Sequence, residues 1–76
     1  MSVFTKTYNV NFNEKQKEAL TRAFKGTASY FLNEKKVDVE VVVSSFQGKK
    51  IIANLYAGNA LIESRIIGSN GGLTLV

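Results

Sequence analysis

Residues 37–44 read VDVEVVVS, and this stretch decides the fold. Apolar and polar side chains alternate along it, which is typical of a β-strand with one buried face. The segments Lys50–Ala57 and Ala60–Ile67 follow closely along the chain. Their β-branched residues favour strands over a helix. The sequence therefore predicts a three-stranded antiparallel meander over residues 37–67.

Two short turns set the expected register of this meander. Residues 46–48 (FQG) form a three-residue loop that places Val43 opposite Ile51. Residues 58–59 (GN) form a two-residue primed turn that places Ile66 opposite Ile51. Both turns put the same apolar residues on one face, so the register is well specified.

The opposite face of the meander is predicted to be mixed in character. It carries five sizeable apolar side chains, which suggests that terminal strands, a second subunit or a ligand covers part of it. These side chains are Val42, Ile52, Tyr56, Leu61 and Ile67. The same face is predicted to carry Lys50, Asn54 and Arg65, together with the acidic Asp38, Glu40 and Glu63.

A strand and a helix are predicted before the meander. Residues 4–12 alternate in polarity and predict a strand that joins the sheet at an edge or in its middle. Asn13 is a favoured N-cap, and Gln16 can close a capping box with it. The helix that follows is expected to end at Gly26, acting as a C-terminal cap. Its outer face carries Lys15, Glu18, Arg22 and Lys25.

Residues 27–32 (TASYFL) fit two interpretations. Phe24, Ala28 and Phe31 continue the helical spacing if Gly26 is tolerated inside a longer helix. Alternatively, Ala28, Tyr30 and Leu32 alternate as a strand, and this is the interpretation that we favour. After the meander, residues 68–72 form a glycine-rich turn, and residues 73–76 form a short last strand.

The predicted fold class is therefore α+β. An antiparallel sheet of four to six strands carries one helix on one face, in the order strand, helix, optional strand and four strands. Residues 1–76 are expected to form a single small domain, because a chain of 76 residues is near the lower limit for unaided folding. Small domains without disulfides often gain stability by oligomerising.

The composition argues against an enzyme. The chain has no histidine and no cysteine, so it lacks the usual general base, thiol nucleophile and soft metal ligands. Glu40 and Glu63 are predicted to lie about 10 Å apart across the sheet, with Asn54 between them, and a solvated polar row explains them best. We expect no cofactor and no metal. The N-terminus lacks a signal-peptide pattern and no apolar run is long enough to span a membrane, so we expect an intracellular protein.

Two binding functions are compatible with these features. The net charge of +4 favours nucleic-acid binding. The candidate residues are Lys50, Arg65, Tyr56 and Asn54 on the sheet, and Lys15, Arg22 and Lys25 on the helix. The alternative is a protein-binding module, such as an inhibitor, an adaptor or the subunit of a homo-oligomer. Its candidate interface residues are Val42, Ile52, Leu61, Ile67 and Val76.

Overall fold

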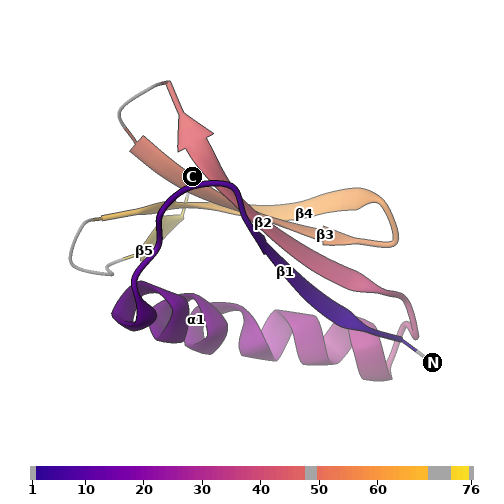
Figure 1. The fold of residues 1–76 in the computed structure, drawn as a ribbon. Helices are drawn as coiled ribbons and strands as arrows, with labels where there is room; N and C mark the ends of the chain where they lie inside the picture. The colour runs from indigo at the N-terminus through magenta and orange to yellow at the C-terminus, as the bar shows by residue number, and fades with distance from the viewer. Residues whose placement is uncertain (1, 48–49, 69–72, 76) are drawn as a thin grey trace.

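The structure is a computed structural model that describes residues 2–47, 50–68 and 73–75. These residues form one helix and five strands. In chain order they are β1 (Phe4–Tyr8), α1 (Glu14–Asn33), β2 (Val39–Phe46), β3 (Lys50–Ala57), β4 (Ala60–Ile67) and β5 (Leu73–Leu75). The strands form one sheet in the order β1-β2-β3-β4-β5, and α1 lies across one face of it (Figure 1). The predicted α+β class is confirmed.

The sheet is mixed rather than purely antiparallel. Strands β2 to β5 pair antiparallel as predicted, whereas β1 pairs parallel to β2 at one edge. The cause is the helix, whose 20 residues span about 30 Å and carry the chain back past the start of β1. Chain reversal by a crossover of this length is what a parallel pair requires. The backbone N–H of Val39 donates to the carbonyl of Val3 at 2.9 Å, so both strands begin at the same end of the sheet.

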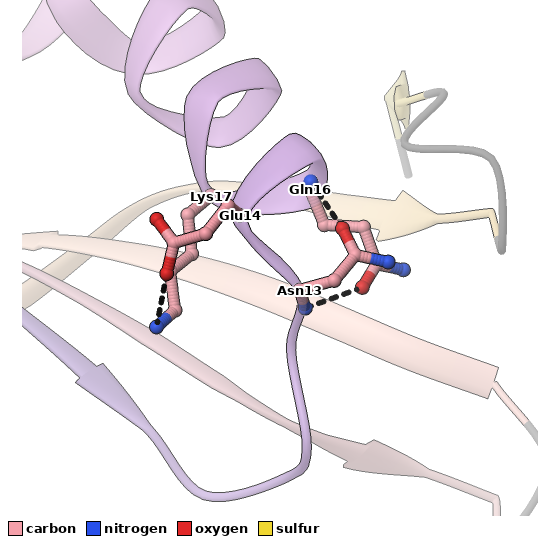
Figure 2. A network of polar contacts seen from close by, with 4 residues as sticks. All are labelled: Asn13, Glu14, Gln16 and Lys17. Carbon is pink, nitrogen blue, oxygen red and sulfur yellow. Dashed lines mark hydrogen bonds and ion pairs between the residues drawn. The ribbon is translucent and has the colours of Figure 1, made fainter.

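The N-terminus of α1 forms as predicted. The Asn13 side chain accepts a hydrogen bond from the backbone N–H of Gln16 at 2.8 Å, and the Gln16 side chain accepts one from the backbone N–H of Asn13 at 3.1 Å (Figure 2). This reciprocal pair is a complete capping box. The buried Gln16 also donates to the carbonyl of Gly68, at 3.3 Å, which ties the helix start to the end of β4.

The predicted strand over residues 27–32 and the predicted cap at Gly26 are both wrong. The helix continues to Asn33, and Glu34 is its C-cap. Gly26 is tolerated inside the helix because it faces solvent, where a missing side chain leaves no cavity. The gain from continuing is the burial of Ala28, which is 1% exposed and packs on the sheet with Phe24 and Leu20.

The predicted register of the β2–β3 hairpin is wrong by two residues. Val43 pairs with Ala53, because β2 continues to Phe46 and Phe46 pairs with Lys50 at the start of β3. A shift of two residues leaves every side chain on its expected face, since strand side chains alternate with a period of two. Val39, Val41 and Val43 therefore still face the helix and are buried.

The β3–β4 hairpin departs more seriously from the prediction. Gly58 and Asn59 form the expected two-residue turn, with φ angles of 56° and 74° as a primed turn requires. A β-bulge follows, because Tyr56 pairs with Leu61 whereas Leu55 pairs with Glu63, so that Ile62 is the extra residue. One extra residue moves every later side chain of β4 to the other face.

The bulge decides which β4 residues face the helix. Glu63, Arg65 and Ile67 lie on the helix side, whereas Ser64 and Ile66 lie on the open side of the sheet. Ile67 is 5% exposed and belongs to the core. The predicted placement of Glu63, Arg65 and Ile67 on the open face is therefore wrong.

Candidate functional site

The bulge separates the four sheet residues that were predicted to bind nucleic acid. Lys50, Asn54 and Tyr56 lie on the open face of β3, but Arg65 lies on the helix side. Lys50 and Tyr56 stand at opposite ends of β3, six positions or about 20 Å apart by the rise of a strand. Asn54 is partly buried and its side-chain carbonyl accepts a hydrogen bond from the Ser64 hydroxyl at 2.6 Å. These residues do not form one cationic platform.

Arg65 has a structural partner instead. Its Nε lies 2.6 Å from Oε2 of Glu63, and its guanidinium lies 5.5 Å from the centre of the buried Phe24 ring. Both charged side chains are largely shielded from solvent, at 27% and 19% exposure. The ion pair neutralises the arginine and closes the edge of the core beside α1.

The three predicted helix residues keep their expected position. Lys15, Arg22 and Lys25 are all exposed on the side of α1 that faces away from the sheet. Lys15 and Arg22 are seven residues apart, so they lie two helical turns apart on nearly the same line. The three basic residues predicted on the helix therefore lie together on one exposed side of α1.

Two further lysines, which sequence reasoning did not select, lie where α1 meets β1. Lys6 Nζ lies 5.1 Å from the centre of the Phe4 ring and bonds to the Thr21 hydroxyl at 3.0 Å. Lys17 Nζ lies 5.2 Å from the centre of the Tyr8 ring. The sequence held one signal that pointed to Lys6, because this lysine interrupts the apolar side of residues 4–12. Such an interruption at an edge strand indicates a charged rim.

Tyr8 lies next to Phe12 and Lys17. It stacks on Phe12 with ring centres 5.4 Å apart. Burial raises the pKa of the Tyr8 hydroxyl above its usual value, the Lys17 ammonium opposes this shift, and the Glu14 carboxylate adds to it. Glu14 also pairs with Lys17 at 3.5 Å on the helix surface (Figure 2). The phenol therefore stays neutral at ordinary pH.

The net positive charge is concentrated in the first 33 residues. This part of the chain, which forms β1 and α1, has five basic and two acidic residues, a net charge of +3 out of the total of +4. Residues 34–76 have five basic and four acidic residues, a net charge of only +1. We use the name cationic surface for Lys15, Arg22 and Lys25 on the outward side of α1 together with Lys6 and Lys17 on its flank beside β1.

The predicted apolar interface is mostly covered by the chain itself. Ile67 belongs to the core, Ile52 is 8% exposed although it lies on the open face, and Val42 is half-buried. Leu61 is 57% exposed, beside the bulge. Val76 lies outside the described residues. The open face therefore exposes less apolar surface than its sequence suggested.

A depression of about 870 Å³ lies at the end of the sheet where β2 begins. It is lined by polar and charged side chains over a small apolar floor, and it opens to solvent.

No group of three or more metal-ligating side chains is found in the described part of the chain. Within residues 2–47, 50–68 and 73–75, no helix is both long enough and apolar enough to cross a membrane.

Comparison of this chain with protein-family models, with curated proteins and with solved structures found no match in any of the three.

Proposed function

We propose that this protein is a non-enzymatic nucleic-acid-binding protein that contacts the phosphate backbone through the cationic surface. The observation that carries the proposal is the charge asymmetry between the two parts of the chain. Five cations and only two carboxylates belong to β1 and α1, and they account for most of the net charge. A basic surface concentrated on one helix is the usual electrostatic footprint of backbone binding.

The geometry of the cationic surface suits an extended polyanion. Lys15 and Lys25 are ten positions apart on α1, which is about 15 Å of helix. Duplex DNA carries one charge per about 1.7 Å of its axis, so this length faces several phosphates at once. Lys6 is already oriented by the Phe4 ring and the Thr21 hydroxyl, and pre-orientation lowers the entropy cost of each contact.

Neither the cationic surface nor the open face of the sheet is suited to recognising a particular base sequence. The cationic surface consists of lysines and one arginine, which contact phosphates without carrying sequence information. On the open face of the sheet, Asn54 is engaged by Ser64, and Glu40 is exposed, where it would repel phosphate. We therefore expect binding that depends on charge and little on sequence.

The proposal is tested by fluorescence anisotropy of labelled DNA and RNA, single- and double-stranded, over a range of salt concentrations. Four phosphate contacts on duplex DNA would give a slope of about −3.6 for log affinity against log salt. The affinity would then fall about 150-fold between 50 and 200 mM salt. No measurable binding even at the lowest salt would refute the proposal.

Matched variants locate the surface. Arg22→Gln combined with Lys25→Gln removes two charges and keeps good helix formers. We expect a loss of affinity of about tenfold or more and a salt slope shallower by about two units. Lys50→Gln, on the open face of the sheet, is the control and should change little. A larger loss from Lys50→Gln than from the helix pair would place binding on the sheet face.

A protein-binding module remains the alternative function. It draws on Leu61 and Ile62, which are 57% and 40% exposed around the bulge. The alternative predicts that Leu61→Asp abolishes association with little dependence on salt, whether the partner is another protein or a second copy of this chain. Light scattering of the purified protein over a concentration range measures self-association directly.

A further inference from the structure

The depression at the end of the sheet lies on the opposite side of the fold from the start of α1. It forms where the N-terminal end of β1, the C-terminal end of α1 and the start of β2 come together (Figure 1). The β3–β4 turn contributes its remaining wall. Its volume of about 870 Å³ falls within the range of pockets that hold small organic ligands.

Hydrogen bonds fix the walls of this depression to one another. The backbone N–H of Val3 donates to Oδ1 of Asp38 at 3.0 Å, and the N–H of Gly58 donates to the Asp38 carbonyl at 3.0 Å. The N–H of Val37 donates to the Phe31 carbonyl at 3.2 Å. One residue, Asp38, therefore joins the chain start to the β3–β4 turn, and the next bond joins the same loop to α1. The site is built before any ligand arrives.

The wall contains a strained residue. Lys36 has a φ of 55°, in the left-handed region that glycine and asparagine favour and other side chains avoid. A left-handed residue is common just after a helix, and the bond from the Val37 N–H to the Phe31 carbonyl closes the end of α1 around Lys36. Lys36 also lines the depression, so the end of α1 fixes the backbone of this part of its wall.

The polar groups around the depression favour a neutral ligand. Asp38 and Glu40 contribute two carboxylates, against one ammonium from Lys36. The C-terminal end of α1 adds partial negative charge, and its last turn contains no basic residue. An anionic ligand is therefore disfavoured here, in contrast to the cationic surface. Within the described part of the chain, the hydrogen bonds to these carboxylates use Oδ1 of Asp38 and Oε2 of Glu40, and the second oxygen of each makes no hydrogen bond there.

The donor and acceptor pattern matches hydroxyl groups. Carboxylates accept hydrogen bonds from hydroxyls, whereas the amides of Asn33 and Asn59 both donate and accept. Tyr56 is half-buried in the wall, and Leu32 and Val39 contribute apolar surface. The lining is nevertheless more polar than apolar, which suits a ligand rich in hydroxyl groups better than an apolar one.

We propose that this depression binds a neutral, hydroxyl-rich ligand of monosaccharide or disaccharide size. Glu40 and Asp38 accept hydrogen bonds from its hydroxyls, Asn33, Lys36 and Asn59 donate to its oxygens, and Tyr56 contacts its carbon–hydrogen face. This site is independent of the cationic surface, so either proposal stands if the other fails.

The proposal is tested by titrating the ¹⁵N-labelled full chain with ribose, glucose, maltose and cellobiose, and by following backbone amide shifts. We expect saturable shifts that cluster in residues 33–40 and 56–59 for at least one sugar, with a Kd of about 1–10 mM. Glucose 6-phosphate should bind several-fold more weakly than glucose, because its charge meets the two carboxylates. Shifts that do not saturate, or that scatter over the whole fold, would overturn the proposal.

A pair of variants makes the test specific. Glu40→Gln keeps the size of the side chain but removes its charge, and we expect the affinity for the bound sugar to fall about tenfold. Glu18→Gln makes the same chemical change on the exposed face of α1 and should leave the affinity unchanged. The amide spectrum of each variant shows directly whether the fold is kept. Equal affinity in Glu40→Gln and the unmodified chain would refute the assigned role of Glu40 and, with it, the site.

Discussion

Replacing Gly26 by alanine should stabilise the protein, although most substitutions of a small protein destabilise it. Gly26 lies inside α1 with its position exposed, and a Cβ built there meets no atom within 4 Å. The change therefore adds no clash and removes the cost of glycine in a helix interior, which is about 0.8–1 kcal/mol. For a domain of this size, the melting temperature should rise by about 4–8 °C.

The measurement is thermal and urea unfolding followed by circular dichroism at matched protein concentration. Gly58→Ala is the matched control, because it makes the same chemical change at a φ of +56°. There the new Cβ would lie 3.6 Å from Val37 Cβ, an ordinary contact, so only the backbone conformation opposes it. We expect Gly58→Ala to lower stability by about 1 kcal/mol or more. A loss of stability in Gly26→Ala would mean that the helix ends at Gly26, and residues 27–32 would need another structure.

Three further perturbations test other parts of the fold. Asn13→Ala removes the N-cap, and we expect urea unfolding to show a loss of about 1 kcal/mol; an unchanged midpoint would contradict the capping box. Lys36→Gly relieves the left-handed backbone and should raise stability by about 0.5–1 kcal/mol, whereas the same change at the exposed helical Lys25 should lower it. Tyr8→Phe should reduce the loss of stability in alkali. The folded pKa of Tyr8 is raised above the unfolded value of 10.0, so its contribution is complete below that pH and is lost as the pH rises through the folded pKa. Unfolding free energies at about pH 8 and about pH 11 measure this, and equal losses in both proteins would contradict it.

The features that sequence predicted correctly depend on local chemistry. Alternation over residues 37–44 places Val39, Val41 and Val43 on the buried face whatever the exact pairing. A register error of two residues therefore did not change which side chains were predicted to be buried. Gly58 and Asn59 specify their turn by themselves, because a primed turn requires a positive φ at both positions and glycine and asparagine adopt it most readily. The capping box depends only on two side chains three residues apart.

The features that sequence missed depend on tertiary packing. Nothing local marks the bulge, because Leu61 and Ile62 are both apolar and either can occupy the paired position. The polar character of Glu63 and Arg65 pointed to solvent, whereas the two side chains neutralise each other beside Phe24. The four candidate sheet residues do not share one face for this reason, since one inserted residue moved Arg65 to the opposite face. The helix candidates Lys15, Arg22 and Lys25 lie where they were predicted, because helical spacing alone sets their position.

The position of β1 has a consequence for synthesis of the chain. Its parallel pairing joins Phe4 to Val39, so the first strand to be made lies 35 residues ahead of its sheet partner. At the usual rates of translation this separation lasts about 2–7 s, during which its sheet partner β2 has not yet been made. Lys6 lies in the middle of β1, with Phe4 and Tyr8 on the same side. A lysine at that position discourages pairing between nascent chains, and thus protects the segment until the meander emerges.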